Sequence, residues 1–108
     1  MTNTSSPPVA VQGLGGAVVG VSAGLDQTCA VLADGHIQCW GYNAWGALGN
    51  GTLVSSSVPV TVSDVSDAVA VSAGYTHTCA VTSTGRVLCW GQGLDYAMVS
   101  KPVEVPGF

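Results

Sequence analysis

The 108-residue sequence contains very few charged side chains. Asp, Glu, Lys and Arg make up 7% of it, and only Arg86 and Lys101 are basic. Typical soluble domains have about 25% charged residues. Two cations cannot neutralise several phosphates, so we predict that nucleic acid is not a partner.

The sequence also lacks a long apolar run. None reaches the roughly 18 residues that span a bilayer, and the first thirty residues lack the charged start and apolar middle of a signal peptide. We therefore predict no membrane partner and find no targeting signal in this sequence.

Residues that favour helices are scarce as well. Lysine and glutamate occur once each, whereas there are eighteen valines, twenty serines and threonines together, and fifteen glycines. β-branched side chains lose little rotamer freedom on a pleated surface. The composition therefore predicts an all-β protein.

One stretch occurs twice, fifty residues apart. Val71–Gly91 (VSAGYTHTCAVTSTGRVLCWG) repeats Val21–Gly41 (VSAGLDQTCAVLADGHIQCWG). A fixed period of this length is typical of arrays whose units cannot bury their own faces and must stack on neighbours. A PVxV element flanks the two units three times, at Pro8–Val11, Pro59–Val62 and Pro102–Val105.

These repeats predict the organisation of the chain. Residues 1–16 are expected to end a preceding repeat, and residues 17–62 and 63–108 to form two successive units. Each unit is expected to contain four strands, the last of them PVxV, with the other three at Ala17–Ala23, Thr28–Leu32 and His36–Trp40, and at Ala68–Ala73, Thr78–Thr82 and Arg86–Trp90. Apolar residues occur on both faces of these strands, so we expect both faces to be covered.

The four cysteines are expected to face each other in pairs. A three-residue loop ending in glycine joins the second and third strands of each unit, which is typical of a type I turn with a bulge. This loop length places Cys29 opposite Cys39 and Cys79 opposite Cys89. Opposed residues lie about 4.5–5.5 Å apart, close enough for a disulfide.

We therefore expect the disulfides Cys29–Cys39 and Cys79–Cys89, with reduced core thiols or a metal site as alternatives. Nine intervening residues exceed the spacing usual for zinc ligands. If the disulfides form, the protein works in an oxidising compartment, extracellular or periplasmic.

Gly20–Gly24 (GVSAG) matches the G-x-S-x-G pattern, which would make Ser22 an esterase nucleophile. That chemistry needs a strand–turn–helix corner and a histidine base. No helix is expected, and VSAG recurs at Val71–Gly74 without the leading glycine. A structural repeat is therefore the stronger interpretation.

Other candidate chemistry is weak. His36 and His77 have no Asp or His partner at metal or helical spacing, so we expect His36 to face solvent and His77 to be a hydrogen-bonded structural residue. Asp64 and Asp67 lack the further ligands of a calcium site and are expected in a loop. We predict no catalytic, cofactor-binding or metal-ligating residue, and no cofactor.

Aromatic residues outside the repeated positions are candidates for recognition. Trp40 and Trp90 recur with the cysteines and are expected to pack. The other copy has no aromatic residue opposite Tyr42, Trp45, Tyr75 and Tyr96. Aromatic side chains are enriched in binding hot spots, so these four are candidate contacts to a protein or a glycan, with local loop packing as the alternative.

The order VSAG, HTCAV, TGRVLCWG, N-x-x-G-x-LG-x-GT and PVxV resembles the repeat of the regulator of chromosome condensation family, in the cysteine-bearing form of bacterial proteins. The resemblance covers nearly the whole chain. It implies a β-propeller, usually of seven blades of four antiparallel strands, so this chain would supply about two. Members serve as exchange factors, inhibitors, sensors or scaffolds, and fold alone does not choose between them.

Two blades leave apolar sheet faces at both ends, and such faces tend to associate. We therefore predict a non-enzymatic module for protein binding, scaffolding or self-assembly. Three or four copies would close a ring, or the remaining repeats of a longer propeller would complete it. The alternatives are a secreted glycan-binding or enzyme-inhibitory propeller and, more remotely, a serine hydrolase acting through Ser22.

Overall fold

The computed structural model describes residues 14–24, 27–43, 46–75, 77–92 and 98–105, and every regular element in these ranges is a strand. The first sheet contains β1 (Val18–Ala23), β2 (Gln27–Leu32), β3 (Ile37–Gly41) and β4 (Ser56–Thr61). The second contains β5 (Ala68–Ala73), β6 (His77–Thr82), β7 (Val87–Gln92) and β8 (Met98–Glu104). Both sheets are antiparallel with their strands in chain order, so the all-β prediction is confirmed.

The predicted division at residues 16 and 62 stays a prediction, and residues 1–13 lie outside the described ranges. Within the part of the chain that the structure describes, no helix is long and apolar enough to cross a membrane.

The β2–β3 and β6–β7 hairpins have the predicted register. Cys29 lies opposite Cys39 and Cys79 lies opposite Cys89. Gly35 and Gly85 close the two turns with φ angles of 92° and 87°. A residue with a Cβ rarely adopts such angles, so the terminal glycine of each loop fixes the turn and, through it, the pairing of the cysteines.

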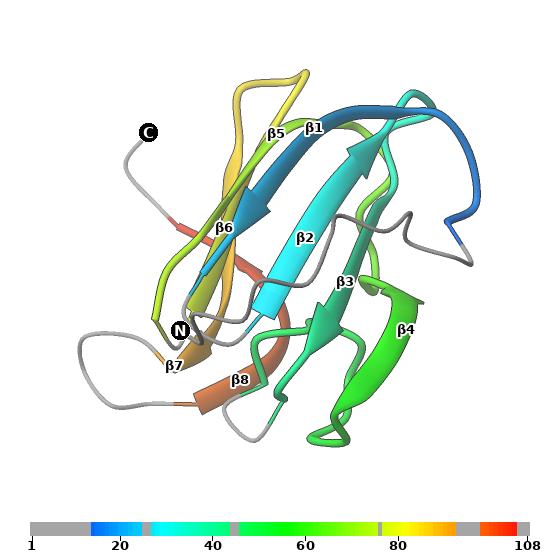
Figure 1. Ribbon diagram of the computed structural model, residues 1–108. Coiled ribbons are helices and arrows are strands. Elements are labelled where there is room, and N and C mark those ends of the chain that lie inside the picture. Colours follow the sequence, from blue (N-terminus) through cyan, green and yellow to red (C-terminus); the bar gives the residue numbers. More distant parts are fainter. Residues whose placement is uncertain (1–13, 25–26, 44–45, 76, 93–97, 106–108) are drawn as a thin grey trace.

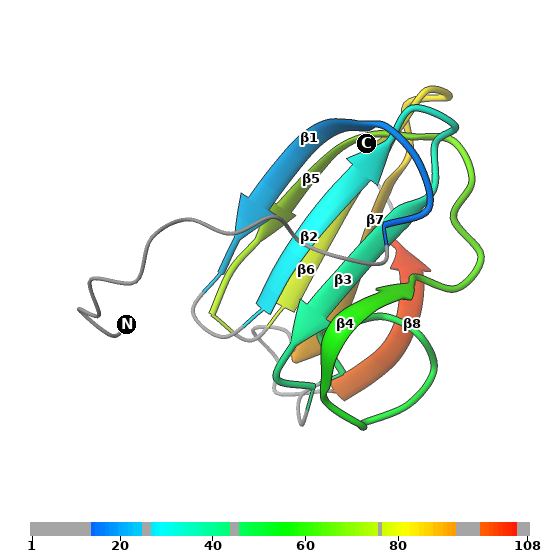
Figure 2. The same cartoon turned by 45° about the vertical axis from the view of Figure 1, so that its right-hand side comes forward.

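The two sheets stack face to face, as Figures 1 and 2 show from two directions. In both views β5 runs beside β1, and β5 also contacts β2. Strands β1 and β5 are built from small residues and valine, which allows their backbones to approach closely.

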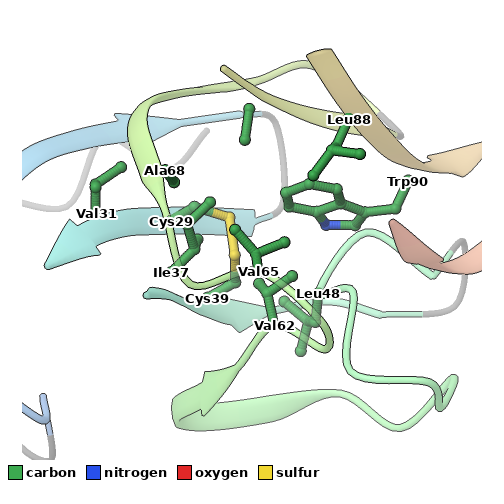
Figure 3. Packing of buried hydrophobic residues seen from close by; sticks show 11 residues of the cluster. Cys29, Val31, Ile37, Cys39, Leu48, Val62, Val65, Ala68, Leu88 and Trp90 are labelled. Atoms are coloured by element: carbon green, nitrogen blue, oxygen red, sulfur yellow. A yellow bond between two sulfur atoms is a disulfide. The ribbon is translucent and has the colours of Figure 1, made fainter. Parts of the chain in front are cut away.

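One hydrophobic core lies between the sheets (Figure 3). Its members come from both repeats and from the connections between strands: Cys29, Val31, Ile37, Cys39, Leu48, Val62, Val65, Ala68, Ala80, Leu88 and Trp90. Burying one large apolar side chain contributes about 1.5–3 kcal/mol. Because neither repeat supplies the whole cluster, each sheet is stabilised by the other.

The two sheets differ in how far their faces are covered. In β2 both the even-numbered and the odd-numbered residues are largely buried, whereas β6 alternates between buried and exposed positions. Val31 in β2 is fully buried, but Val81, fifty residues later, is 41% exposed. The expectation that both faces are covered therefore holds for β2 and is wrong for the outer face of β6.

Candidate interaction surfaces

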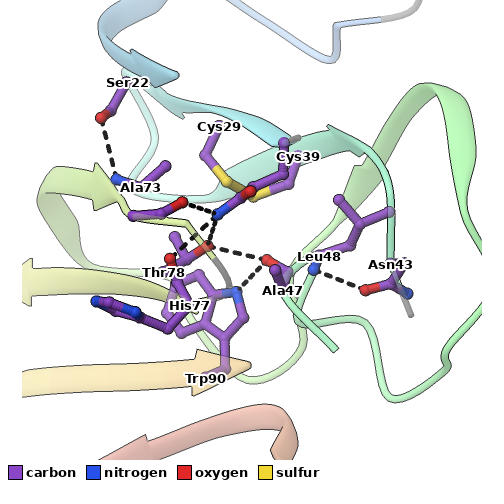
Figure 4. The surroundings of a disulfide bond; sticks show 12 residues. Ser22, Cys29, Cys39, Asn43, Ala47, Leu48, Ala73, His77, Thr78 and Trp90 are labelled. Atoms are coloured by element: carbon purple, nitrogen blue, oxygen red, sulfur yellow. Dashed lines mark hydrogen bonds between the residues drawn. A yellow bond between two sulfur atoms is a disulfide. The ribbon is translucent and has the colours of Figure 1, made fainter. Parts of the chain in front are cut away.

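The contact between the repeats is polar as well as apolar (Figure 4). Gln27 is buried, and its Nε2 donates to the carbonyl oxygens of Gly74 (2.9 Å) and His77 (3.1 Å). The hydroxyl of Ser22 accepts a hydrogen bond from the backbone N–H of Ala73 at 3.0 Å. These bonds fix the first repeat against the β5–β6 turn of the second.

The glycine of the first VSAG motif lies where the two backbones meet. A Cβ on Gly24 would collide with the carbonyl oxygen of Gly74 and would lie 2.9 Å from Nε2 of Gln27. The absence of a side chain at Gly24 therefore permits the hydrogen bonds of Gln27. The glycine of the VSAG motif is thus explained by packing between the two repeats.

Asn43 organises the long loop between β3 and β4. Its side chain is fully buried, and its Nδ2 donates to the carbonyl oxygens of Thr52 (2.8 Å) and Val54 (3.1 Å). Its Oδ1 accepts from the backbone N–H of Leu48 at 2.8 Å. The sequence signal for this residue was the first asparagine of N-x-x-G-x-LG-x-GT.

The same loop attaches the first repeat to the second sheet. The carbonyl oxygen of Ala47 accepts hydrogen bonds from Nε1 of Trp90 (2.8 Å) and from Oγ1 of Thr78 (3.0 Å). The backbone N–H of Gly51 donates to the carbonyl oxygen of Ser100 at 2.8 Å. This loop therefore joins the sheets, and the expected packing role of Trp90 is observed.

The outer face of the second sheet carries no further sheet within the described residues. We call it the open face; it comprises Ser72, His77, Cys79, Val81, Val87 and Cys89. Of these, Ser72, His77 and Val81 are exposed and the others are half-buried. Four residues at the equivalent positions of the first sheet, Cys29, Val31, Ile37 and Cys39, are all fully buried beneath the second sheet.

Two of the four candidate recognition residues are described. Tyr42 follows β3 and is 48% exposed, and Tyr75 follows β5 and is 72% exposed. Strands β3 and β5 end at the same end of the stacked sheets, so both tyrosines lie there. Trp45 and Tyr96 lie outside the described residues, and a recognition role for any of the four stays a prediction.

Both cysteine pairs have their sulfur atoms at disulfide-bonding distance. The Cα atoms of each pair are 4.1 Å apart. The first pair is fully buried between the sheets and the second lies half-buried on the open face. No group of three or more His, Cys, Asp or Glu in the described ranges is placed to hold a metal ion.

His36 has an acidic neighbour, Asp34, at a spacing that is neither helical nor typical of metal ligands. Its Nδ1 lies 3.2 Å from Oδ1 of Asp34, and its side chain is about half exposed. The backbone N–H of His36 donates to the same oxygen at 3.1 Å, and this bond and the imidazole lower the pKa of Asp34. The pair belongs to the exposed β2–β3 turn.

His77 and Ser22 occupy structural positions in the repeat. His77 is exposed, whereas Gln27 at the equivalent position is buried and hydrogen-bonded to the second repeat. Ser22 lies in β1, which leads into β2 rather than into a helix. A nucleophile elbow requires a strand–turn–helix corner.

Comparison with known proteins agrees with this architecture. Models of the regulator of chromosome condensation (RCC1) repeat match residues 34–81 and, in a second form, residues 18–47 and 68–96. Human WBSCR16 superposes with a TM-score of 0.79 at 23% identity, over 88% of this chain and 27% of that one.

Two yeast structures are also similar. Prp20p of Saccharomyces cerevisiae, described with its binding properties to Gsp1p and histones, gives a TM-score of 0.70 at 23% identity, over 84% of this chain and 26% of that one. Yeast RCC1 (Prp20) bound to Kap60 gives 0.74 at 18% identity, over 94% and 26%.

These structures share the fold, and this chain spans about a quarter of their length. The two stacked sheets are accordingly two β-propeller blades. The chain belongs to the RCC1 repeat family.

Proposed function

We propose that this chain is a non-enzymatic propeller module that binds proteins, and that it binds copies of itself first. The observation that supports this function is the open face. In the first repeat, the residues equivalent to Cys79, Val81, Val87 and Cys89 of the open face are fully buried. In the second repeat, Val81 is 41% exposed. An exposed apolar residue at a position that a sheet covers in the first repeat supports a protein–protein contact at this face.

Three or four copies of a two-blade chain would supply six or eight blades and close a ring. The PVxV strands complicate this arrangement, because one terminal strand would have to complete a neighbour's blade. If the cysteine pairs are oxidised, the assembly works outside the cytoplasm, in an extracellular or periplasmic space.

The mass of the native particle tests this proposal. Light scattering is expected to give three or four times the 10.8 kDa chain mass. Reductant is expected to lower stability but not stoichiometry, because each cysteine pair joins two strands of one hairpin. A stable, folded monomer at high chain concentration would contradict self-assembly.

A second candidate function is recognition of a protein or glycan through Tyr42 and Tyr75. Their exposure at one end of the sheets supports it. Replacing both by alanine should abolish binding to a panel of immobilised glycans while leaving the native mass unchanged. The remote hydrolase alternative is tested with Ser22→Ala on p-nitrophenyl acetate, for which we expect no loss of turnover.

A further inference from the structure

The chain carries both halves of a blade-to-blade interface but forms that interface only once. Inside the chain, the cysteine face of the first sheet covers the face of the second sheet that bears Leu88 and Trp90. The open face of the second sheet has the same repeat positions as the cysteine face of the first sheet. The outer face of the first sheet has the same repeat positions as the covered face of the second sheet, with Trp40 in the place of Trp90 and Gln38 in the place of Leu88.

The outer face of the first sheet also carries Ala30 and Leu32, which are buried, and Gln38, which is half-buried. Its less covered part, which we call the receiving face, comprises Val21, Ala23, Thr28 and Trp40. Val21 is 65% exposed, whereas Val71, fifty residues later, is partly buried against the core. Trp40 is half-buried, whereas Trp90 is fully buried. The receiving face thus has the residue types of a covered surface.

The connection that precedes β1 is compatible with stacking on this face. The backbone N–H of Gly15 donates to Oε1 of Gln38 in the interior strand β3 at 2.8 Å, so this connection lies over Gln38 on the outer face of the sheet. Val65, fifty residues later, lies in the core between the two stacked sheets. A connection in this place therefore coexists with a covering sheet.

His77 presents its imidazole where Gln27 presents its amide. A Cβ on Gly24 would lie 2.9 Å from Nε2 of Gln27, and a Cβ on Gly74 would lie 3.0 Å from Nε2 of His77. Each side chain therefore covers the glycine of its own turn. Gln27 uses this position to donate to the next blade.

The acceptors that His77 requires also exist in the first repeat. Gln27 binds the carbonyls of Gly74 and His77, which belong to one turn of the second repeat. Within this turn the backbone N–H of Gly74 donates to the carbonyl oxygen of His77 at 2.8 Å. In the first repeat the Gly24 N–H donates to the Gln27 oxygen at 2.7 Å. The two turns hold their carbonyls in the same way.

We propose that the open face of one copy stacks on the receiving face of a second copy, with His77 of the first donating its ring N–H to the backbone carbonyl of Gly24 of the second. The proposal rests on the proposed self-association and specifies its direction, head to tail. A head-to-tail contact uses two different surfaces, so it generates rings or open chains rather than simple two-fold dimers.

Two surface variants test the direction. Val81→Asp disables the open face and leaves the receiving face intact, whereas Val21→Asp does the reverse. Each variant alone is expected to be monomeric in analytical ultracentrifugation. An equal mixture should form a dimer containing one chain of each, because one good open face meets one good receiving face and growth stops there.

The control is Val54→Asp, since Val54 is an exposed residue of the β3–β4 loop on neither face. It should keep the wild-type mass. Near-ultraviolet circular dichroism checks that each variant is folded. If an aspartate prevents folding, Val21→Thr and Val81→Thr keep the branched strand residue and provide the same comparison through weaker association.

Several outcomes overturn the proposal. If Val21→Asp keeps the wild-type mass, the open faces pair with each other, and if Val81→Asp keeps it, the receiving faces do. Folded variants that remain monomeric when mixed also contradict it. A monomeric wild-type chain instead contradicts the proposed self-assembly itself, so the two failures are distinguishable.

His77 gives an independent test of the polar contact. His77→Ala should weaken association of the wild-type chain about tenfold, since one hydrogen bond between copies is lost. His77→Gln should retain the wild-type affinity, because glutamine makes the equivalent contact at position 27. If the His77→Ala and wild-type chains associate with equal affinity, His77 makes no hydrogen bond between copies.

Discussion

At the residue scale, the informative position is the one where the two copies differ. Gln27 is buried and bound to two carbonyls of the next blade, and His77 at the same place in the repeat is exposed. The surrounding motif is the same in both copies, so the neighbouring blade, and not the motif, accounts for the difference in burial.

Gln27→Ala is expected to lower the free energy of unfolding by about 2 kcal/mol. The substitution leaves a buried gap and removes a donor from two backbone carbonyls. Urea denaturation of a Val81→Asp monomer measures the effect without association. His77→Ala in the same background is the matched control and should cost less than about 0.5 kcal/mol. Equal losses would contradict the assigned role of Gln27.

At the element scale, the two cysteine hairpins have the same ring size but different surroundings. Both pairs have a sequence separation of 10, so the loop-entropy contribution of a disulfide is about 2–3 kcal/mol for each. Only Cys29 and Cys39 are also fully buried core residues. Comparing the hairpins therefore separates the bridge from the packing.

Replacing Cys29 and Cys39 together by alanine should cost about 1–2 kcal/mol more than replacing Cys79 and Cys89, because only the first change leaves a cavity in the core. Chemical denaturation of both double variants in the Val81→Asp background measures the difference. Reductant should have no further effect on a hairpin whose cysteines are replaced. Equal destabilisation by the two double variants would show that burial of the first pair adds nothing.

At the scale of the whole molecule, the core belongs to both blades together. Leu48 from the β3–β4 loop and Trp90 from β7 lie in one cluster with Cys29. Such a molecule is expected to unfold as one unit, since neither sheet keeps its buried face without the other. Association then adds to stability, because each further blade covers an exposed face.

The melting temperature should therefore rise with chain concentration, since binding that requires the folded state stabilises it by mass action. The Val81→Asp variant should melt at the same temperature at every concentration. Far-ultraviolet circular dichroism and tryptophan fluorescence at several concentrations measure this, and their transitions should coincide. A wild-type melting temperature independent of concentration would contradict linked folding and assembly.

Much of each blade follows from local sequence. The spacing of Cys29 and Cys39 around a three-residue loop ending in Gly35 fixes the hairpin register, because strand pairing has a period of two and the turn sets its origin. Valine content and the repeat predicted strands in their observed order. The sequence also drew attention to the exposed tyrosines Tyr42 and Tyr75, because the other copy of the repeat has no aromatic residue at the equivalent positions.

The contacts between blades were not predictable in the same way. The carbonyl of Ala47 binds Trp90 and Thr78 from more than thirty residues away, and no periodicity in the sequence indicates a backbone acceptor. In the β3–β4 loop the sequence drew attention to Tyr42 and Trp45, but it gave no sign that Leu48 and the carbonyl of Ala47 attach this loop to the next blade.

The sequence by itself determined the repeat, the hairpin register and the family, because these depend on the local order of side chains. Only the tertiary structure decided which faces are covered, because stacking joins residues fifty positions apart. The same motif is buried at Cys29 and partly exposed at Cys79, since the second blade covers the first copy and no sheet among the described residues covers the second.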